Sequence, residues 1–254
     1  MRTALTVVLG MSLAGCLGVV DAPGGSTPPP GGGGDDDTGG TPALNVAIDK
    51  GTISTELGSS NVATVTLTSS GGFTGSATIT ASVVDAAGTA ISDWTVTLDN
   101  PTVTVPANGV ATAKATVMIP TLMGANLTGT LKLDVTAGEL STQSVSSAIT
   151  AANVVTLVIT ENAAGQCVYP AVQATQVKSG TEVHWLNMSN DITNMIIHSD
   201  GAANIAHENQ AAGAGTPINQ FYAQTPSATT QTSDHWYCHS LNDPGNGQVI
   251  VVNP

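Results

Sequence analysis

Residues 63–68 read Ala-Thr-Val-Thr-Leu-Thr, and this stretch decides the fold. Apolar and hydroxyl-bearing side chains alternate with a period of two, so a strand would place one kind on each of its faces. Threonine and valine are also residues that strands favour. The same alternation returns at 111–117, Ala-Thr-Ala-Lys-Ala-Thr-Val, and at 131–135, Leu-Lys-Leu-Asp-Val. These stretches predict half-buried β-strands.

Turn-forming residues separate the alternating stretches of residues 43–150. Glycine, proline, asparagine and aspartate gather at 71–72, 99–101, 108–109 and 124, where they favour tight turns. About seven short strands with such turns are typical of a β-sandwich. No segment shows the apolar period and the caps of a helix. We therefore predict an all-β chain in which residues 43–150 form a Greek-key β-sandwich.

Residues 151–254 alternate as well and predict a second Greek-key β-sandwich. Residues 155–159 place three apolar side chains on one face of a strand, and the apolar run 249–252 suits a buried strand near the end of the chain. We expect Trp236 and Tyr237 to pack in the core of this sandwich.

The composition excludes several classes of protein. The 254 residues carry 5 Lys+Arg against 18 Asp+Glu, a formal net charge of −13. Little basic charge is available to neutralise phosphates, so we expect no nucleic-acid partner. A hydrophobic fraction of 41% is too high for a chain that is disordered throughout. All 5 histidines lie at or after His184, which directs the search for chemistry to the C-terminal part.

The N-terminus has the form of an export signal. One positive charge precedes an apolar run at 4–14 that is too short to span a bilayer. Residues 13–16, Leu-Ala-Gly-Cys, resemble a bacterial lipobox. The resemblance implies a signal segment at 1–16 and an acylated Cys16 that anchors the chain in a membrane. Because leucine follows the cysteine, it also implies an outer-membrane lipoprotein facing the periplasm or the cell surface. The alternative is an ordinary signal peptide with an incidental cysteine.

Residues 17–42 predict a disordered linker. They hold the runs Pro28–Pro30, Gly31–Gly34 and Asp35–Asp37 and show no apolar period. A flexible chain of this length has an end-to-end distance of about 30 Å. The linker would therefore hold the folded part of the chain away from a membrane surface.

Two stretches of the first predicted sandwich resemble the immunoglobulin-like modules of bacterial secreted proteins. They are Gly-Phe-Thr-Gly at 72–75 and Asn-Pro-Thr-Val at 100–103. The resemblance implies a spacer domain. A carbohydrate-binding or adhesive surface is the alternative, but Phe73 and Trp94 are the only aromatic residues of 43–150, too few for an aromatic platform.

Three stretches of the second predicted sandwich, taken in order, resemble a cupredoxin. They are Val-His-Trp-Leu-Asn at 183–187, Met-Ile-Ile-His at 195–198 and His-Trp-Tyr-Cys-His at 235–239. The resemblance implies that His198 and Cys238, which are 40 positions apart, are copper ligands. It further implies electron transfer or copper handling with an unidentified redox or protein partner.

The resemblance leaves the remaining copper ligands open. A blue-copper site needs one thiolate, two imidazoles and a weak axial ligand. Where the family places its second histidine, this chain has Leu-Asn-Asp-Pro at 241–244. His207 and His239 are the candidates for that ligand, although His239 adjoins Cys238 and adjacent strand residues point to opposite faces. Gln248 is the axial candidate.

A disulfide is the alternative to a copper site. If Cys16 carries the lipid, Cys167 and Cys238 remain as an even pair in an exported protein. In cupredoxins the loop corresponding to Cys167 runs beside the copper end, so a Cys167–Cys238 bond is compatible with the fold and would consume the thiolate. The chain would then be a metal-free, degenerate cupredoxin that acts as a structural or interaction module at the cell surface.

We expect no enzymatic activity. The sequence has no Gly-x-Ser-x-Gly nucleophile elbow. Glu208 and Asp234 are neighbours of histidines in the sequence, but this alone does not make a catalytic triad.

Overall fold

The chain is all-β in the computed structural model, which describes residues 40–122, 127–208, 214–238 and 247–254. The predicted fold class is thereby confirmed. The described residues contain no helix that is long and apolar enough to cross a membrane. The signal segment, Cys16 and residues 17–39 of the predicted linker lie outside the described residues.

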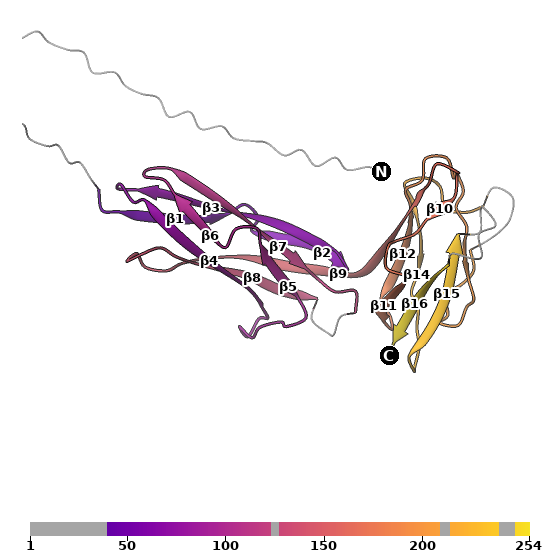
Figure 1. Ribbon diagram of the computed structural model, residues 1–254. Coiled ribbons are helices and arrows are strands. Elements are labelled where there is room, and N and C mark those ends of the chain that lie inside the picture. The colour runs from indigo at the N-terminus through magenta and orange to yellow at the C-terminus, as the bar shows by residue number, and fades with distance from the viewer. Residues whose placement is uncertain (1–39, 123–126, 209–213, 239–246) are drawn as a thin grey trace, which may run out of the picture. The chain divides into compact units, whose positions relative to one another are not determined.

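Sixteen strands make up the described fold, and Figure 1 labels all of them except β13. They are β1 Ala43–Ile48, β2 Thr52–Leu57, β3 Ser60–Ser70, β4 Gly75–Val84, β5 Thr95–Leu98, β6 Thr102–Val105, β7 Val110–Met118, β8 Thr128–Thr136, β9 Gln143–Glu161, β10 Cys167–Val168, β11 Ala174–Lys178, β12 Glu182–Asn187, β13 Ile197–Ser199, β14 Phe221–Gln224, β15 Thr232–Cys238 and β16 Gln248–Asn253.

The first sandwich consists of two sheets. One has the strand order β1-β3-β7-β5, and the other contains β9-β8-β4-β6 with β2 paired to β9. The stretch 63–68 lies in β3, where Ala63, Val65 and Leu67 are buried and the threonines between them lie on the other face. β3 pairs antiparallel with β7, whose stretch 111–117 alternates in the same way. Every second side chain in these stretches is therefore more buried than its neighbours, as the alternation in the sequence predicts.

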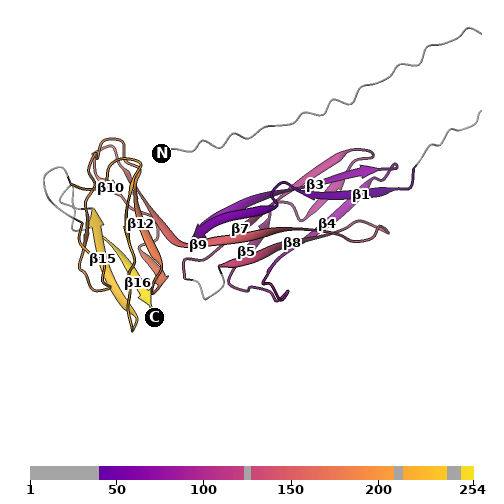
Figure 2. The same cartoon turned by 180° about the vertical axis from the view of Figure 1, so that it is seen from behind.

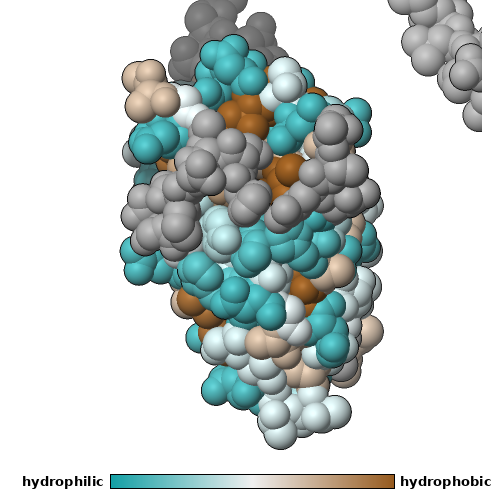
Figure 3. Space-filling model, turned by 90° about the vertical axis from the view of Figure 1, so that its right-hand side faces the viewer, coloured by the Kyte–Doolittle hydropathy of each residue, from teal (hydrophilic) through white to brown (hydrophobic). Residues whose placement is uncertain are grey.

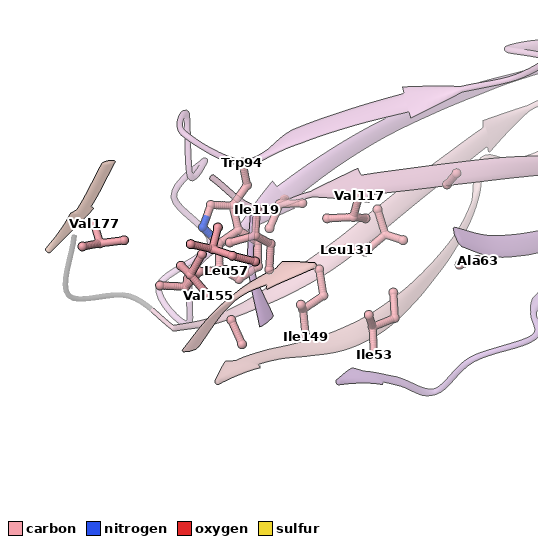
Figure 4. Close-up of a cluster of buried hydrophobic side chains, with 14 of the residues drawn as sticks. Ile53, Leu57, Ala63, Trp94, Val117, Ile119, Leu131, Ile149, Val155 and Val177 are labelled. Carbon is pink, nitrogen blue, oxygen red and sulfur yellow. The ribbon is translucent and has the colours of Figure 1, made fainter. Parts of the chain in front are cut away.

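Branched aliphatic side chains fill the space between these sheets. In the close-up of Figure 4, Trp94, Ile119 and Leu57 lie together, and Leu131 and Ile149 come from β8 and β9, in the same sheet as Leu57. All five are at most 4% exposed. Burial of apolar area of this kind is the main favourable term in folding, and here it depends on aliphatic residues because the sandwich has few aromatic ones.

Strand β9 belongs to both sandwiches. It is 19 residues long, and Figure 2 shows it running from the first group of strands to the second. Its first part pairs with β8, up to Thr150, and its later part pairs in parallel with β12, from Val154. Strand β2 follows it across this point, since Leu57 pairs with Val155 after a bulge. The boundary predicted between residues 150 and 151 thus falls inside a continuous strand.

The second sandwich places its site-bearing strands in a separate sheet. One sheet continues from β9 through β12 to β14, and the other has the order β11-β16-β15-β13. Trp185 of β12 and Trp236 of β15 meet edge to face between the sheets, with ring centroids 5.7 Å apart. Both indoles are buried. The apolar run near the C-terminus forms β16, in which Ile250 and Val252 are fully buried.

The packing of β9 can be tested with two valines of that strand. Val155 is 2% exposed and Val158 is 43% exposed. We expect Val155→Ala to lower the free energy of unfolding by about 1.5–3 kcal/mol, because it removes buried apolar area. Val158→Ala is the matched control and should change it by no more than about 0.5 kcal/mol. Denaturant titration measures both values, and equal losses would contradict the assigned faces of β9.

Candidate functional site

Successive side chains of β15 alternate between the core and the outer face of the sheet. Asp234, Trp236 and Cys238 are buried, whereas His235 and Tyr237 between them are partly exposed. This follows from the pleat, which turns successive residues to opposite faces. The expectation that Trp236 and Tyr237 both pack in the core is therefore wrong for Tyr237.

Cys238 is joined to Cys167 by a disulfide. The Cα atoms are 6.4 Å apart, and both cysteines are buried. The bond links β10, which pairs with β9, to β15 of the facing sheet. Tyr169 packs beside it, since its hydroxyl oxygen accepts a hydrogen bond from the Cys238 backbone N–H at 3.0 Å and its ring meets Trp236 edge to face at 5.5 Å. The Cys238 sulfur is thus part of a buried link between sheets.

His198 faces away from that sulfur. In the register of β13 and β15, Ile197 lies opposite Cys238, and His198 lies opposite Tyr237. Ile197 is fully buried, while the His198 ring stacks on the ring of Tyr237 with centroids 4.4 Å apart. The structure therefore brings His198 and Cys238 onto neighbouring strands but turns their side chains to opposite faces of the sheet.

The other candidate copper ligands divide between the same two faces. His207 lies against His198, with ring centroids 4.4 Å apart. Gln248 is buried and pairs with Trp236, on the side of Cys238. His239 lies outside the described residues. The described residues do not fit the one-thiolate, two-imidazole set of a blue-copper site, because the sulfur is bonded to Cys167 and the imidazoles lie on the opposite face.

The outer face instead gathers a group that we call the histidine face: His198, Asp200, His207, His235 and Tyr237. His235 Nδ1 lies 3.8 Å from Asp200 Oδ2, and His198 Nε2 lies 3.9 Å from Asp200 Oδ1. The backbone fixes this arrangement, since the Asp200 N–H donates to the His235 carbonyl at 3.1 Å. Sequence reasoning missed Asp200 and His235. The spacing of two residues from His198 to Asp200, and from His235 to Tyr237, was the available signal.

The buried carboxylate of Asp234 holds the segment that follows β13. Asp234 is fully buried and accepts hydrogen bonds from the Ser199 hydroxyl at 2.8 Å and the Ala203 N–H at 2.9 Å. Charge-assisted bonds of this kind are stronger than neutral ones. Asp234 is therefore engaged in holding residues 199–203, and its position next to His235 in the sequence serves this structural purpose.

Glu208 and Tyr222 fix the end of the segment that carries His207. The Glu208 carboxylate accepts hydrogen bonds from the Ile197 N–H at 2.9 Å and the Thr216 hydroxyl at 2.8 Å. Tyr222 of β14 donates its hydroxyl to the Ala206 carbonyl at 2.8 Å. Burial raises the pKa of Tyr222, and the negative charge of Glu208 adds to the effect. The phenol therefore keeps its proton, and with it the hydrogen bond to the segment.

No family model matches this chain, and no curated protein matches it. Solved structures with a related architecture include a family 123 glycoside hydrolase from Clostridium perfringens, described for glycolipid glycan hydrolysis, at 12% identity over 43% of this chain and 27% of that one, with a TM-score of 0.36. A PapD-like domain of human CEP192 matches at 11% identity over 42% of this chain and 82% of that one, with a TM-score of 0.29. The periplasmic chaperone SfaE matches at 11% identity over 82% and 99%, with a TM-score of 0.30. The chain has an immunoglobulin-like β-sandwich architecture, like the PapD-like domain and the chaperone, and nothing about activity follows.

The contribution of the disulfide to stability can be measured directly. Its cysteines are 71 residues apart, and a closed loop of that size should stabilise the fold by roughly 4 kcal/mol. We expect reduction to lower the denaturant midpoint of the wild-type chain accordingly. The double variant Cys167→Ala/Cys238→Ala is the control, because its midpoint should not respond to reductant. A wild-type midpoint that is the same with and without reductant would count against the bond.

Proposed function

We propose that this chain is an exported, lipid-anchored protein without enzymatic activity, in which two β-sandwiches act as a structural or interaction module at the outer membrane. In this proposal the C-terminal sandwich is a degenerate cupredoxin. A disulfide stands where the family resemblance expects a copper thiolate.

The Cys167–Cys238 disulfide carries this proposal. A disulfide sulfur is not a thiolate, and the thiolate is the ligand that defines a blue-copper centre. The outward direction of His198, opposite Tyr237 rather than Cys238, supports the same conclusion, since even a reduced Cys238 would not meet this imidazole. Disulfides of this kind also persist in oxidising compartments outside the cytoplasm, which agrees with the proposed export.

Residues that precede the first sandwich support the lipid anchor, and the outer faces of that sandwich support the module role. The lipobox-like residues 13–16 and the linker 17–42 supply the attachment and the reach. In the first sandwich, both outer faces present hydroxyl groups and few charges: β3 alternates threonines outward, and β4 does the same with Thr78 and Thr80. Among the described strands of these faces, the titratable side chains include Lys114 of β7 and the pair Lys132 and Asp134 of β8, which lie 3.2 Å apart. Faces with so few charges support a spacer or interaction role.

The first test counts thiols and follows copper. In the mature chain, unfolded without reductant, we expect no reactive thiol, and two after reduction. Added Cu²⁺ should produce no intense visible thiolate-to-copper absorption. The variant Cys167→Ser frees the Cys238 sulfur, and it should still show no such band because His198 faces away. Free thiols in the wild type together with that band would overturn the proposal in favour of a copper carrier.

The second test concerns Cys16. Expressed in a Gram-negative host, the wild-type chain should fractionate with the outer membrane and incorporate labelled fatty acid. Cys16→Ala removes the acylated residue, so we expect no label and release of the chain from that fraction, since each buried CH₂ of an acyl chain contributes about 0.8 kcal/mol to membrane binding. Cys167→Ala is the matched cysteine control and should keep the label. Labelling that survives Cys16→Ala would refute the anchor.

A further inference from the structure

We propose that the histidine face is a sulfur-free site for a divalent transition-metal ion, with His198, His235 and His207 as imidazole ligands and Asp200 as the carboxylate ligand. This site lies on the opposite side of the sheet from the disulfide. It does not depend on the state of Cys238, and it differs from the ligand set that the cupredoxin resemblance implies.

Asp200 is the centre of the proposed site. Each of its carboxylate oxygens faces one imidazole nitrogen, at 3.9 Å for His198 Nε2 and 3.8 Å for His235 Nδ1. These separations are longer than a hydrogen bond, which ends near 3.2 Å for N–H···O. Two ligands on one tetrahedral ion, with bonds of about 2.0–2.2 Å, lie about 3.4 Å apart. The observed separations exceed that value by only about half an ångström.

Binding requires a small rearrangement of side chains. As placed, no three of the described histidines, cysteines and acids surround a common point. Three of the proposed ligands have room to move, since the side chains of His198, His235 and Asp200 are 27%, 37% and 58% exposed. Rotations about their χ angles between staggered wells are cheap compared with a metal–ligand bond. We therefore expect a site that closes around the ion.

Two histidines are already oriented for ligation. His207 Nδ1 lies 2.6 Å from the Glu208 carbonyl oxygen. A carbonyl oxygen only accepts, so Nδ1 is the donor and Nε2 is the atom that would bind the ion. Metal-binding histidines commonly donate their other N–H to a backbone carbonyl in this way. The Nε2 side of His235 is closed by the backbone of Gly247, where an added Cβ would clash with that nitrogen. The Nδ1 side of the ring is the one that faces Asp200.

The charge of this region favours a bound cation. The sequence contains no lysine or arginine after Lys178. Asp200 lies in the histidine face, and Glu208 follows His207 directly in the chain, whereas the Asp234 carboxylate lies on the buried side of β15. A divalent ion bound between these residues would offset the negative charge of Asp200, at a distance where the Coulomb energy is substantial. Figure 3 shows one face of the second sandwich, on which hydrophilic residues (teal) are interspersed with pale residues and small apolar patches (brown).

The ligand set selects a class of metal. Imidazole nitrogen with one carboxylate oxygen suits Zn²⁺, Cu²⁺ and Ni²⁺, and the order of affinity for such donors places Cu²⁺ first. Without a thiolate, bound Cu²⁺ would have the weak visible absorption of a nitrogen and oxygen site. The proposed site would therefore bind metal at the surface, by imidazoles, while the buried sulfur stays in its disulfide.

Calorimetric titration of the untagged full chain with Zn²⁺ and with Cu²⁺ tests the proposal. We expect one equivalent of ion to bind near neutral pH. Asp200→Asn and His235→Gln should each weaken binding at least tenfold, because loss of second-sphere groups alone costs that much at metal sites. His184→Gln is the matched control, since that histidine lies on β12 and contacts Glu182 and Phe221.

Electron paramagnetic resonance of the Cu²⁺-loaded wild type gives an answer that needs no variant. Nitrogen hyperfine structure from imidazoles, without an intense thiolate band, is the expected result. Failure to bind either ion, or binding that Asp200→Asn and His235→Gln leave unchanged, would overturn the site. An intense thiolate band would instead overturn the proposed function as well, so the two failures are distinguishable.

Discussion

The pleat of β15, held in register with β13, is the constraint on which the chemistry of the second sandwich depends. It turns Cys238 toward Trp236 and the core, and it turns His235 and Tyr237 outward to meet His198. A shift of one residue in this pairing would exchange every side chain between the two faces. The buried indole of Trp236 specifies the register, because such a shift would move it into water. Sulfur and imidazole are therefore kept on different sides by the same packing that forms the core.

On the buried face of β15, the disulfide and the Asp234 carboxylate both hold neighbouring parts of the fold in place. One binds β15 to β10, and the other binds it to the segment after β13. The hydroxyl of Tyr169 accepts the Cys238 N–H at the edge of this region. The Asp234 carboxylate and the Cys238 N–H find hydrogen-bond partners inside the sandwich, whereas the indole N–H groups of Trp185 and Trp236 have none among the described residues. The imidazoles of His198 and His235 lie on the outer face.

Sequence reasoning could predict the strands but not the direction of each functional side chain. The period of two in 63–68 and 111–117 defined β3 and β7, because one-sided burial leaves that period in any sequence. For His198, the resemblance supplied an order along the chain, which contains no information about the register between β13 and β15. Tyr237 was expected in the core because it is aromatic. Its neighbour Trp236 is buried, however, and adjacent strand residues point to opposite faces. The pairing of Asp200 with His235 joins residues that are 35 positions apart along the chain, and only the folded strands bring them together.

The continuity of β9 has a mechanical consequence. Its 19 residues extend over about 60 Å as one strand, with β8 and β2 bonded to its earlier part and β12 to its later part. A chain tethered at its N-terminus and pulled through its C-terminal sandwich would carry the load along this strand. Ladder hydrogen bonds lie across the strand direction, so such a load shears many of them at once instead of opening them one after another. The junction between the two sandwiches would then resist tension, in contrast to the flexible linker predicted before β1.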